Sequence, residues 1–297
     1  MTAALVDPDV LATLESVVQR CLATGTTDGL DVLGYGEITL VVGWPSGAPR
    51  VAAKRLPPFP DPAAAQRYGD LVSEYLEALR AKGVNPVGSD WLTTASSGGT
   101  TVGYVVQPAF PAEDLGASIV AGSDRGRAAS FVADLIAMIP LTVDSRVGLD
   151  SQVSNWVMVD DELRYLDVTT PMLADGSGRT RLDLALLTRS LPAVLRPPAR
   201  RWVAPGIVAA YHRPRDVVVD LIGNLWKERA EDLIDAAISE ANRWVEPSIE
   251  RSEIDRWYRS NARLWELMLR LRRADSFWQR QLRRRPPEFL LPGPIAR

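Results

Sequence analysis

The pattern of apolar residues changes once along this chain, at residues 108–111, and this change limits the folds that the chain can adopt. From residue 30 to residue 107, short runs of β-branched and aromatic residues alternate with turns that contain glycine or proline, which is typical of antiparallel strands. Beyond residue 111, apolar residues recur mostly at helical spacing. Strands followed by helices predict an α+β fold with two lobes, the first a small antiparallel sheet with one helix and the second mainly helical.

A helix is also expected before the sheet. Asp7 and Pro8 form a helix start, and Gly25 is a natural stop. We therefore divide the chain into a helical extension (residues 1–26), the sheet lobe (residues 27–110) and the helical lobe (residues 111–297).

Composition excludes several classes of protein. Cys21 is the only cysteine and His212 the only histidine among the 297 residues, which excludes a disulfide framework and a Cys/His zinc site. The net charge of −3 indicates no electrostatic partner by itself, and binding to nucleic acid is not expected. We find neither a basic, apolar leader nor a run of eighteen uncharged apolar residues, so we expect a cytoplasmic protein without a membrane span.

Residues 147–171 carry the strongest candidate for a chemical site. Asp150 and Asn155 precede a short apolar strand, and Asp167 follows a second strand after an Asp-Asp turn. If the two strands form a hairpin, these three side chains converge at one end of it, as a magnesium and general-base site requires. Asp150 and Asn155 could instead form a turn through hydrogen bonds to the backbone.

Upstream features would complete an anion site. Gly34, Tyr35 and Gly36 connect two predicted strands, and glycines there would let backbone N–H groups approach an anion or simply permit a hairpin turn with positive φ. Lys54 lies in an apolar strand, where it could neutralise phosphate or protect a sheet edge. On the helix predicted between residues 61 and 82, Glu74 could reach Lys54, with Glu77 as the second candidate.

In this order, the features resemble the protein-kinase-like fold, and specifically its small-molecule branch of aminoglycoside phosphotransferase and choline kinase type. The resemblance spans residues 30–173. L-G-Y-G-E-I-T-L-V-V resembles the glycine-rich loop, V-A-A-K the strand with the phosphate lysine, and V-V-Q-P-A-F the adenine-binding hinge. D-S-Q-V-S-N has the D-x-x-x-x-N spacing of the catalytic loop, and L-D-V-T-T-P supplies the metal-binding aspartate.

The resemblance implies a magnesium-dependent transfer of the γ-phosphate of ATP, or of another nucleoside triphosphate, to a hydroxyl of a small molecule such as an antibiotic or a metabolite. Asp150 would act on the acceptor hydroxyl, and Asn155 and Asp167 would bind Mg²⁺. The residues implied to bind the nucleotide are Gly34, Tyr35, Gly36, Glu37, Lys54, Glu74, Gln107 and Ala109, and residues 111–297 would hold the catalytic loop and the acceptor site.

Two departures from the pattern favour alternatives. Gly148 stands where the family usually has histidine, and Val168-Thr169 follows Asp167 in place of Phe-Gly or a similar pair. These differences argue against a protein kinase, and they would also suit a pseudokinase-like interaction module without turnover. Transfer of a nucleotidyl group is a further alternative on the same fold.

The acceptor is not specified by the sequence, nor is the oligomeric state. Asp175, Arg179, Arg181 and Asp183 could line an acceptor cleft, although Asp183 is more simply a structural partner of an arginine. From residue 251 the chain is rich in arginine, with tryptophans at helical spacing. We expect a helix docked on the body of the protein. The other possible partners of this segment are an anionic membrane surface, nucleic acid or an anionic acceptor.

Overall fold

The computed structural model describes residues 5–36 and 38–281. Within these residues, five strands form one antiparallel sheet in the order β1-β2-β3-β5-β4. The strands are β1 (Asp31–Tyr35), β2 (Leu40–Trp44), β3 (Val51–Arg55), β4 (Asp90–Ala95) and β5 (Thr101–Pro108). The central position of β3, between β2 and β5, places Lys54 in the middle of the sheet and excludes the edge-strand explanation for this lysine.

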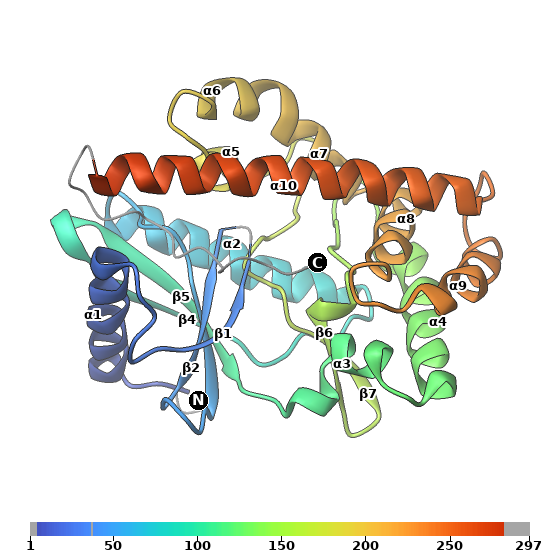
Figure 1. Ribbon diagram of the computed structural model, residues 1–297, viewed down its shortest axis with the longest axis horizontal. Helices are drawn as coiled ribbons and strands as arrows, with labels where there is room; N and C mark the ends of the chain where they lie inside the picture. The colour runs from blue at the N-terminus through green and yellow to red at the C-terminus, as the bar shows by residue number, and fades with distance from the viewer. Residues whose placement is uncertain (1–4, 37, 282–297) are drawn as a thin grey trace.

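One helix covers each face of this sheet (Figure 1). Helix α1 (Pro8–Thr24) begins at Asp7, whose side chain accepts from the Asp9 N–H, and ends at Gly25 in the left-handed conformation. Helix α2 (Pro62–Ala81) follows β3 and begins after Asp61, which caps the Ala64 N–H. Because strand residues alternate between faces, Val42 and Ala53 pack under α1, whereas Val105 packs on the α2 side.

The second lobe is mainly helical. Its helices are α3 (Gly116–Ala121), α4 (Arg125–Thr142), α5 (Leu184–Leu187), α6 (Arg196–Pro198), α7 (Ala204–Ala210), α8 (Pro214–Asn224), α9 (Ile234–Ala241) and α10 (Arg251–Gln281). The hairpin β6 (Trp156–Val159) and β7 (Glu162–Tyr165) lies between α4 and α5 in the sequence. Asp160 and Asp161 both have positive φ, as a two-residue hairpin turn requires.

The predicted α+β architecture, a small antiparallel sheet with one helix followed by a mainly helical lobe, is confirmed. Helix α5 is short: it ends at Leu187, one 3₁₀ turn follows, and Leu191 is extended. Pro192 explains this ending, because a residue that precedes proline is forced away from the helical conformation.

Helix α10 runs along the longest axis of the molecule, past both lobes (Figure 1). Its first turns are anchored on α8 and on the residues that follow it. The Trp257 ring occupies the space beside Gly223 of α8, and Trp226, just after α8, stacks on Tyr258. The expected docking of the arginine-rich segment is therefore observed for the first turns of α10. In the part of the chain that the structure describes, we find no helix with the length and apolar character needed to cross a bilayer.

Candidate active site

The β6–β7 hairpin brings Asp150, Asn155 and Asp167 to one cavity. The Leu166 N–H donates to the Asn155 carbonyl at 2.8 Å, which places the end of the second strand beside the start of the first. The Asn155 Nδ2 donates to the Asp150 carbonyl at 3.2 Å. All three side chains are half-buried and line the same cavity, as the sequence pattern predicts for a hairpin.

Two tyrosines of α2, which the sequence analysis did not assign to the site, fix the backbone around these acids. The Tyr75 hydroxyl donates to the Gly148 carbonyl at 2.9 Å, and the Tyr68 hydroxyl donates to the Thr169 carbonyl at 2.8 Å. Burial raises the pKa of the Tyr68 hydroxyl, and the nearby charge of Asp167 raises it further, so this group stays protonated. The sequence feature that could have indicated both tyrosines is their separation by seven residues, which places them on one face of a helix.

Asp167 is oriented by its own loop. Its Oδ1 accepts from the Thr169 hydroxyl at 2.6 Å and from the Thr169 N–H at 3.3 Å. Thr169 is buried, so the side chain that holds the carboxylate is itself held in place. The Val168-Thr169 pair therefore has a structural use here: Val168 is fully buried in the core, and Thr169 positions Asp167.

Lys54 reaches the same loop from the sheet. Its Nζ donates to the Leu166 carbonyl at 2.6 Å, one residue before Asp167. Burial lowers the pKa of Lys54, and the charge of Asp167 opposes this change. A cation from β3 and a carboxylate from the hairpin, far apart in the sequence, thus lie close together.

Glu74 does not take the position that the sequence analysis expected. It is exposed on α2 and forms an ion pair with Arg181, so the predicted pairing of Glu74 with Lys54 is not the arrangement found. The physical reason is the rotation of the helix, which turns Tyr68 and Tyr75 toward the site. Arg181, predicted as an acceptor residue, is the partner of this glutamate.

The predicted hinge differs from expectation in a similar way. The Ala109 N–H, expected to be available to adenine, donates to the Arg50 carbonyl at 3.0 Å, because β5 continues its pairing with β3 as far as Pro108. Gln107 contributes its side chain: the buried Nε2 donates to the Leu166 carbonyl at 2.8 Å and to the Ser89 hydroxyl at 3.0 Å. Lys54 and Gln107 therefore share one carbonyl acceptor.

The turn between β1 and β2 lies at another part of the cavity, where Tyr35 and Gly36 line it. The Gly36 N–H donates to the Thr39 carbonyl at 2.9 Å, and a Cβ at Gly36 would lie 2.3 Å from the Thr39 Oγ1. Gly34 stands at an irregularity in the β1–β2 pairing. Neither glycine has positive φ, and close packing accounts for Gly36 alone, since a Cβ at Gly34 would make only ordinary contacts with Val41. Glu37 lies outside the described residues.

The donor atoms present suit Mg²⁺ only as part of a larger coordination shell. The Asn155 side chain donates its amide N–H to the Asp150 carbonyl, so its amide oxygen is the atom that could bind a metal. Asp167 offers a carboxylate. Among residues 5–36 and 38–281, no three His, Cys, Asp or Glu side chains are grouped closely enough to bind a metal. A magnesium ion here would thus need phosphate oxygens and water as further ligands.

The other acidic and basic candidates have local structural partners. Asp175 accepts from Ser177 and Arg179 within its own turn, and Asp183 caps α5 through the Ala185 N–H at 2.8 Å. The cavity is lined on its far side by residues of α7 and α10. An anionic acceptor was among the partners considered for the arginine-rich segment that forms α10, whereas no acceptor residue was predicted on α7.

By class, this is an α+β protein in which a sheet lobe and a helical lobe meet at an acidic hairpin. The chain belongs to the family of unknown function DUF6206, whose model matches residues 13–276. No curated protein matches the sequence.

Two solved structures show limited similarity to this chain. A structure of WaaP in complex with acyl carrier protein is 13% identical over 73% of this chain and 89% of that chain, with a TM-score of 0.34. The MAP kinase LmaMPK10 from Leishmania major is 10% identical over 86% of this chain and 99% of that chain, with a TM-score of 0.30.

Proposed function

We propose that this protein is a phosphotransferase that moves the γ-phosphate of a nucleoside triphosphate to a hydroxyl of a small molecule. The observation that carries the proposal is the meeting of Asp150, Asn155 and Asp167 at one cavity, with Lys54 beside Asp167. Phosphoryl transfer requires mainly positioning and charge neutralisation, and these residue types provide both.

Each residue has a separate role in this proposal. Asp150 orients the acceptor hydroxyl and accepts its proton. Asn155 and Asp167 hold Mg²⁺, which supplies charge neutralisation at the phosphates when bound. Lys54 leaves the Leu166 carbonyl to contact phosphate as a point charge, while Gln107 keeps its bond to that carbonyl.

Thermal-shift measurements with ATP, with and without Mg²⁺, test this proposal. A ligand at about 100 times its Kd adds roughly 2.7 kcal/mol of stability, which raises Tm by several degrees. We expect Asp167→Ala to abolish the magnesium-dependent shift, and Asp150→Ala to keep the shift while losing about 10²–10⁴-fold in turnover. Asp134→Ala, at an exposed position of α4, is the matched control. Absence of any magnesium-dependent nucleotide shift in the wild-type protein would contradict the proposal.

A non-catalytic interaction module is the second candidate, and the bonds around the hinge favour it. The Ala109 N–H donates to the Arg50 carbonyl and so is not available to adenine, and Glu74 forms an ion pair with Arg181 in place of Lys54. In such a module the wild-type protein would show neither a nucleotide shift nor ATP hydrolysis. Hydrolysis that disappears in Asp150→Asn would exclude this candidate.

A further inference from the structure

The cavity that contains Asp150 is larger than a nucleotide site needs to be. Its volume is about 1470 Å³, whereas small-molecule sites are commonly about 300–1,000 Å³. From the turn at Tyr35 it continues past Asp150 and reaches α7 and α10. The helical end of the cavity therefore offers space for a second ligand beside the proposed nucleotide.

Much of the wall of this helical end is apolar and aromatic, although Arg196, Glu253 and Arg272 also line the cavity. The side chains that form it include Leu195, Ile207, Val208, Trp257, Trp265 and Met268. Against the apolar part of this wall, a charged group would lose its hydration, which costs free energy. An uncharged apolar chain would gain about 0.8 kcal/mol for each buried CH₂ group.

The cavity opens to solvent through an apolar rim on both helices. Val203 and Ile207 from the α7 side are 50% and 45% exposed although they line the cavity, and Leu264 of α10 is 47% exposed. Trp202, at the same rim, is 74% exposed. Exposed apolar residues gathered around an opening indicate a site for an apolar ligand or surface.

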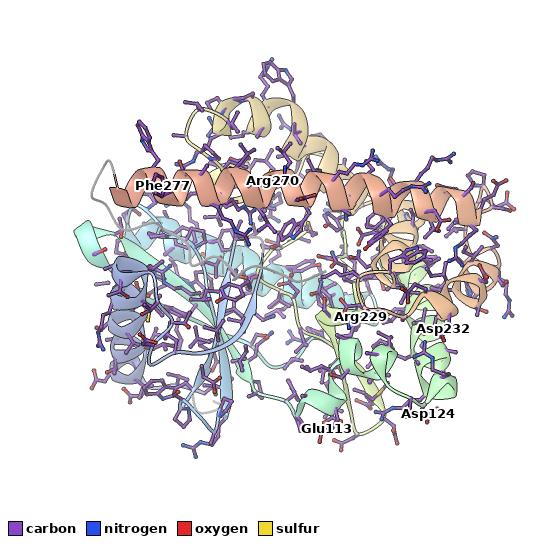
Figure 2. The ribbon with its side chains drawn as sticks, viewed as in Figure 1. Glu113, Asp124, Arg229, Asp232, Arg270 and Phe277 are labelled. Atoms are coloured by element: carbon purple, nitrogen blue, oxygen red, sulfur yellow. The ribbon has the colours of Figure 1, made fainter. Side chains whose placement is uncertain are left out.

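Helix α10 is amphipathic in a way that suits this opening. Leu264, Trp265 and Met268 lie on its cavity side together with the buried Arg272, whereas Arg259, Arg263 and Arg270 are exposed. Figure 2 shows Arg270 and Phe277 on this helix, and Phe277 is also largely exposed. A helix with a mostly apolar face and a second face rich in arginine resembles elements that lie at the surface of lipid.

We propose that the acceptor is an amphiphile, with a hydroxyl-bearing head at Asp150 and a long uncharged chain in the groove between α7 and α10. This proposal rests on the phosphotransfer function proposed above. The head is placed where phosphate would be transferred, and the chain enters through the rim formed by Trp202, Val203, Ile207 and Leu264.

Quenching of tryptophan fluorescence tests the groove directly, because Trp202, Trp257 and Trp265 line the cavity. The probe is 1-(9,10-dibromostearoyl)glycerol below its micelle concentration, since bromine quenches tryptophan on contact. We expect saturable partial quenching, with buried Trp156 outside the cavity unaffected. Ile207→Arg and, from the opposite wall, Leu264→Arg should each weaken binding about tenfold or more, equal to roughly 1.4 kcal/mol.

Leu141→Arg is the matched control, because Leu141 is 67% exposed on α4 and does not line the cavity. Unsaturable quenching, unchanged affinity in both groove variants, or an equal loss in Leu141→Arg would overturn the proposal. Because Ile207 and Leu264 are exposed, we expect both variants to keep the wild-type circular dichroism spectrum. A 1-butyrylglycerol competitor should displace the probe poorly if the chain supplies the affinity.

A second experiment distinguishes an amphiphile taken from a membrane from one taken from solution. Co-sedimentation with phosphatidylcholine vesicles that contain the probe would assign a membrane source, and quenching by dispersed probe without co-sedimentation would assign a soluble one. The two proposals also fail separately. A magnesium-dependent ATP shift without saturable quenching overturns the amphiphile alone, whereas groove-dependent quenching without any ATP shift supports the ligand class and contradicts phosphotransfer.

Discussion

At the scale of single residues, Gly148 shows why this chain departs from the pattern it resembles. A Cβ at this position would lie 2.9 Å from the Tyr211 carbonyl oxygen and 3.1 Å from the His212 Nε2. His212, the only histidine, thus fills the space beside residue 148 from a distant part of the chain. Its Nδ1 lies 3.2 Å from the Asp144 carbonyl and must donate to it, and burial lowers the pKa of the ring, which keeps the ring neutral.

We predict that Gly148→Ala lowers the free energy of unfolding by about 1–3 kcal/mol, the usual cost of overpacking a buried position. The backbone oxygen of Tyr211 cannot move aside easily, because the Leu149 N–H donates to it at 3.1 Å. Gly176→Ala is the matched control, since nothing lies within 4 Å of a Cβ there, and it should change stability by less than about 0.5 kcal/mol. Urea denaturation of the two variants measures the difference; equal midpoints would contradict the prediction.

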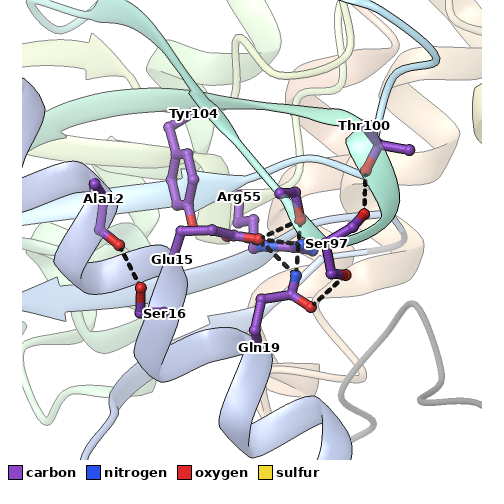
Figure 3. Close-up of polar contacts among 9 residues, drawn as sticks. Ala12, Glu15, Ser16, Gln19, Arg55, Ser97, Thr100 and Tyr104 are labelled. Atoms are coloured by element: carbon purple, nitrogen blue, oxygen red, sulfur yellow. Dashed lines mark hydrogen bonds and ion pairs between the residues drawn. The ribbon is translucent and has the colours of Figure 1, made fainter.

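At the scale of elements, α1 is held on the sheet by a buried polar cluster (Figure 3). Arg55 follows Lys54 in β3 and so points to the opposite face, where it forms a two-pronged ion pair with Glu15 of α1. Glu15 also accepts from the Tyr104 hydroxyl at 2.6 Å and the Gln19 amide at 2.6 Å. Burial disfavours the charge of Glu15, but these bonds more than offset burial and lower its pKa.

We predict that Glu15→Gln lowers the free energy of unfolding at pH 7 by about 3–5 kcal/mol, because the Arg55 charge is left buried without a counterion. Glu113→Gln, at an exposed position, should have little effect. The folded pKa of Glu15 lies below the usual 4.5, so its contribution is present above that value and is lost as the pH falls through the folded pKa. Urea denaturation across this pH range should show the two proteins converge; a constant gap would disprove the pH argument.

At the scale of the whole molecule, the two lobes share one hydrophobic core. Buried residues of α2, such as Tyr75 and Leu79, belong to the same cluster as Leu149 and Trp156 of the helical lobe. Backbone bonds cross the boundary as well, since Val87 and Tyr165 are joined at 2.9 Å. The second cluster lies between α1 and the sheet and contains no residue of the helical lobe.

We therefore predict a single cooperative unfolding transition, with the same midpoint by far-UV circular dichroism and by tryptophan fluorescence. Tyr75→Phe removes the hydrogen bond from α2 to the Gly148 carbonyl and should lower the free energy of unfolding by about 1 kcal/mol. The midpoints of both signals should fall together. Separate midpoints would show that the sheet lobe and the helical lobe unfold independently.

Much of the fold was predictable from local patterns. Helix starts at Asp7 and Asp61 and the stop at Gly25 follow from capping chemistry between near neighbours, which operates in any context. The hairpin that unites Asp150, Asn155 and Asp167 was predictable for the same reason, since a two-residue turn determines which strand residues face each other.

The partners of the charged side chains were not predictable in this way. The sequence by itself determined which elements form and in what order, because hydrophobic period, caps and turns depend on residues close along the chain. Only the tertiary structure decided that Glu74 pairs with Arg181, that Lys54 donates to Leu166, and that α7 and α10 enclose the cavity. Those contacts depend on how each helix is rotated against the core, a property of residues about a hundred positions apart that no local pattern contains.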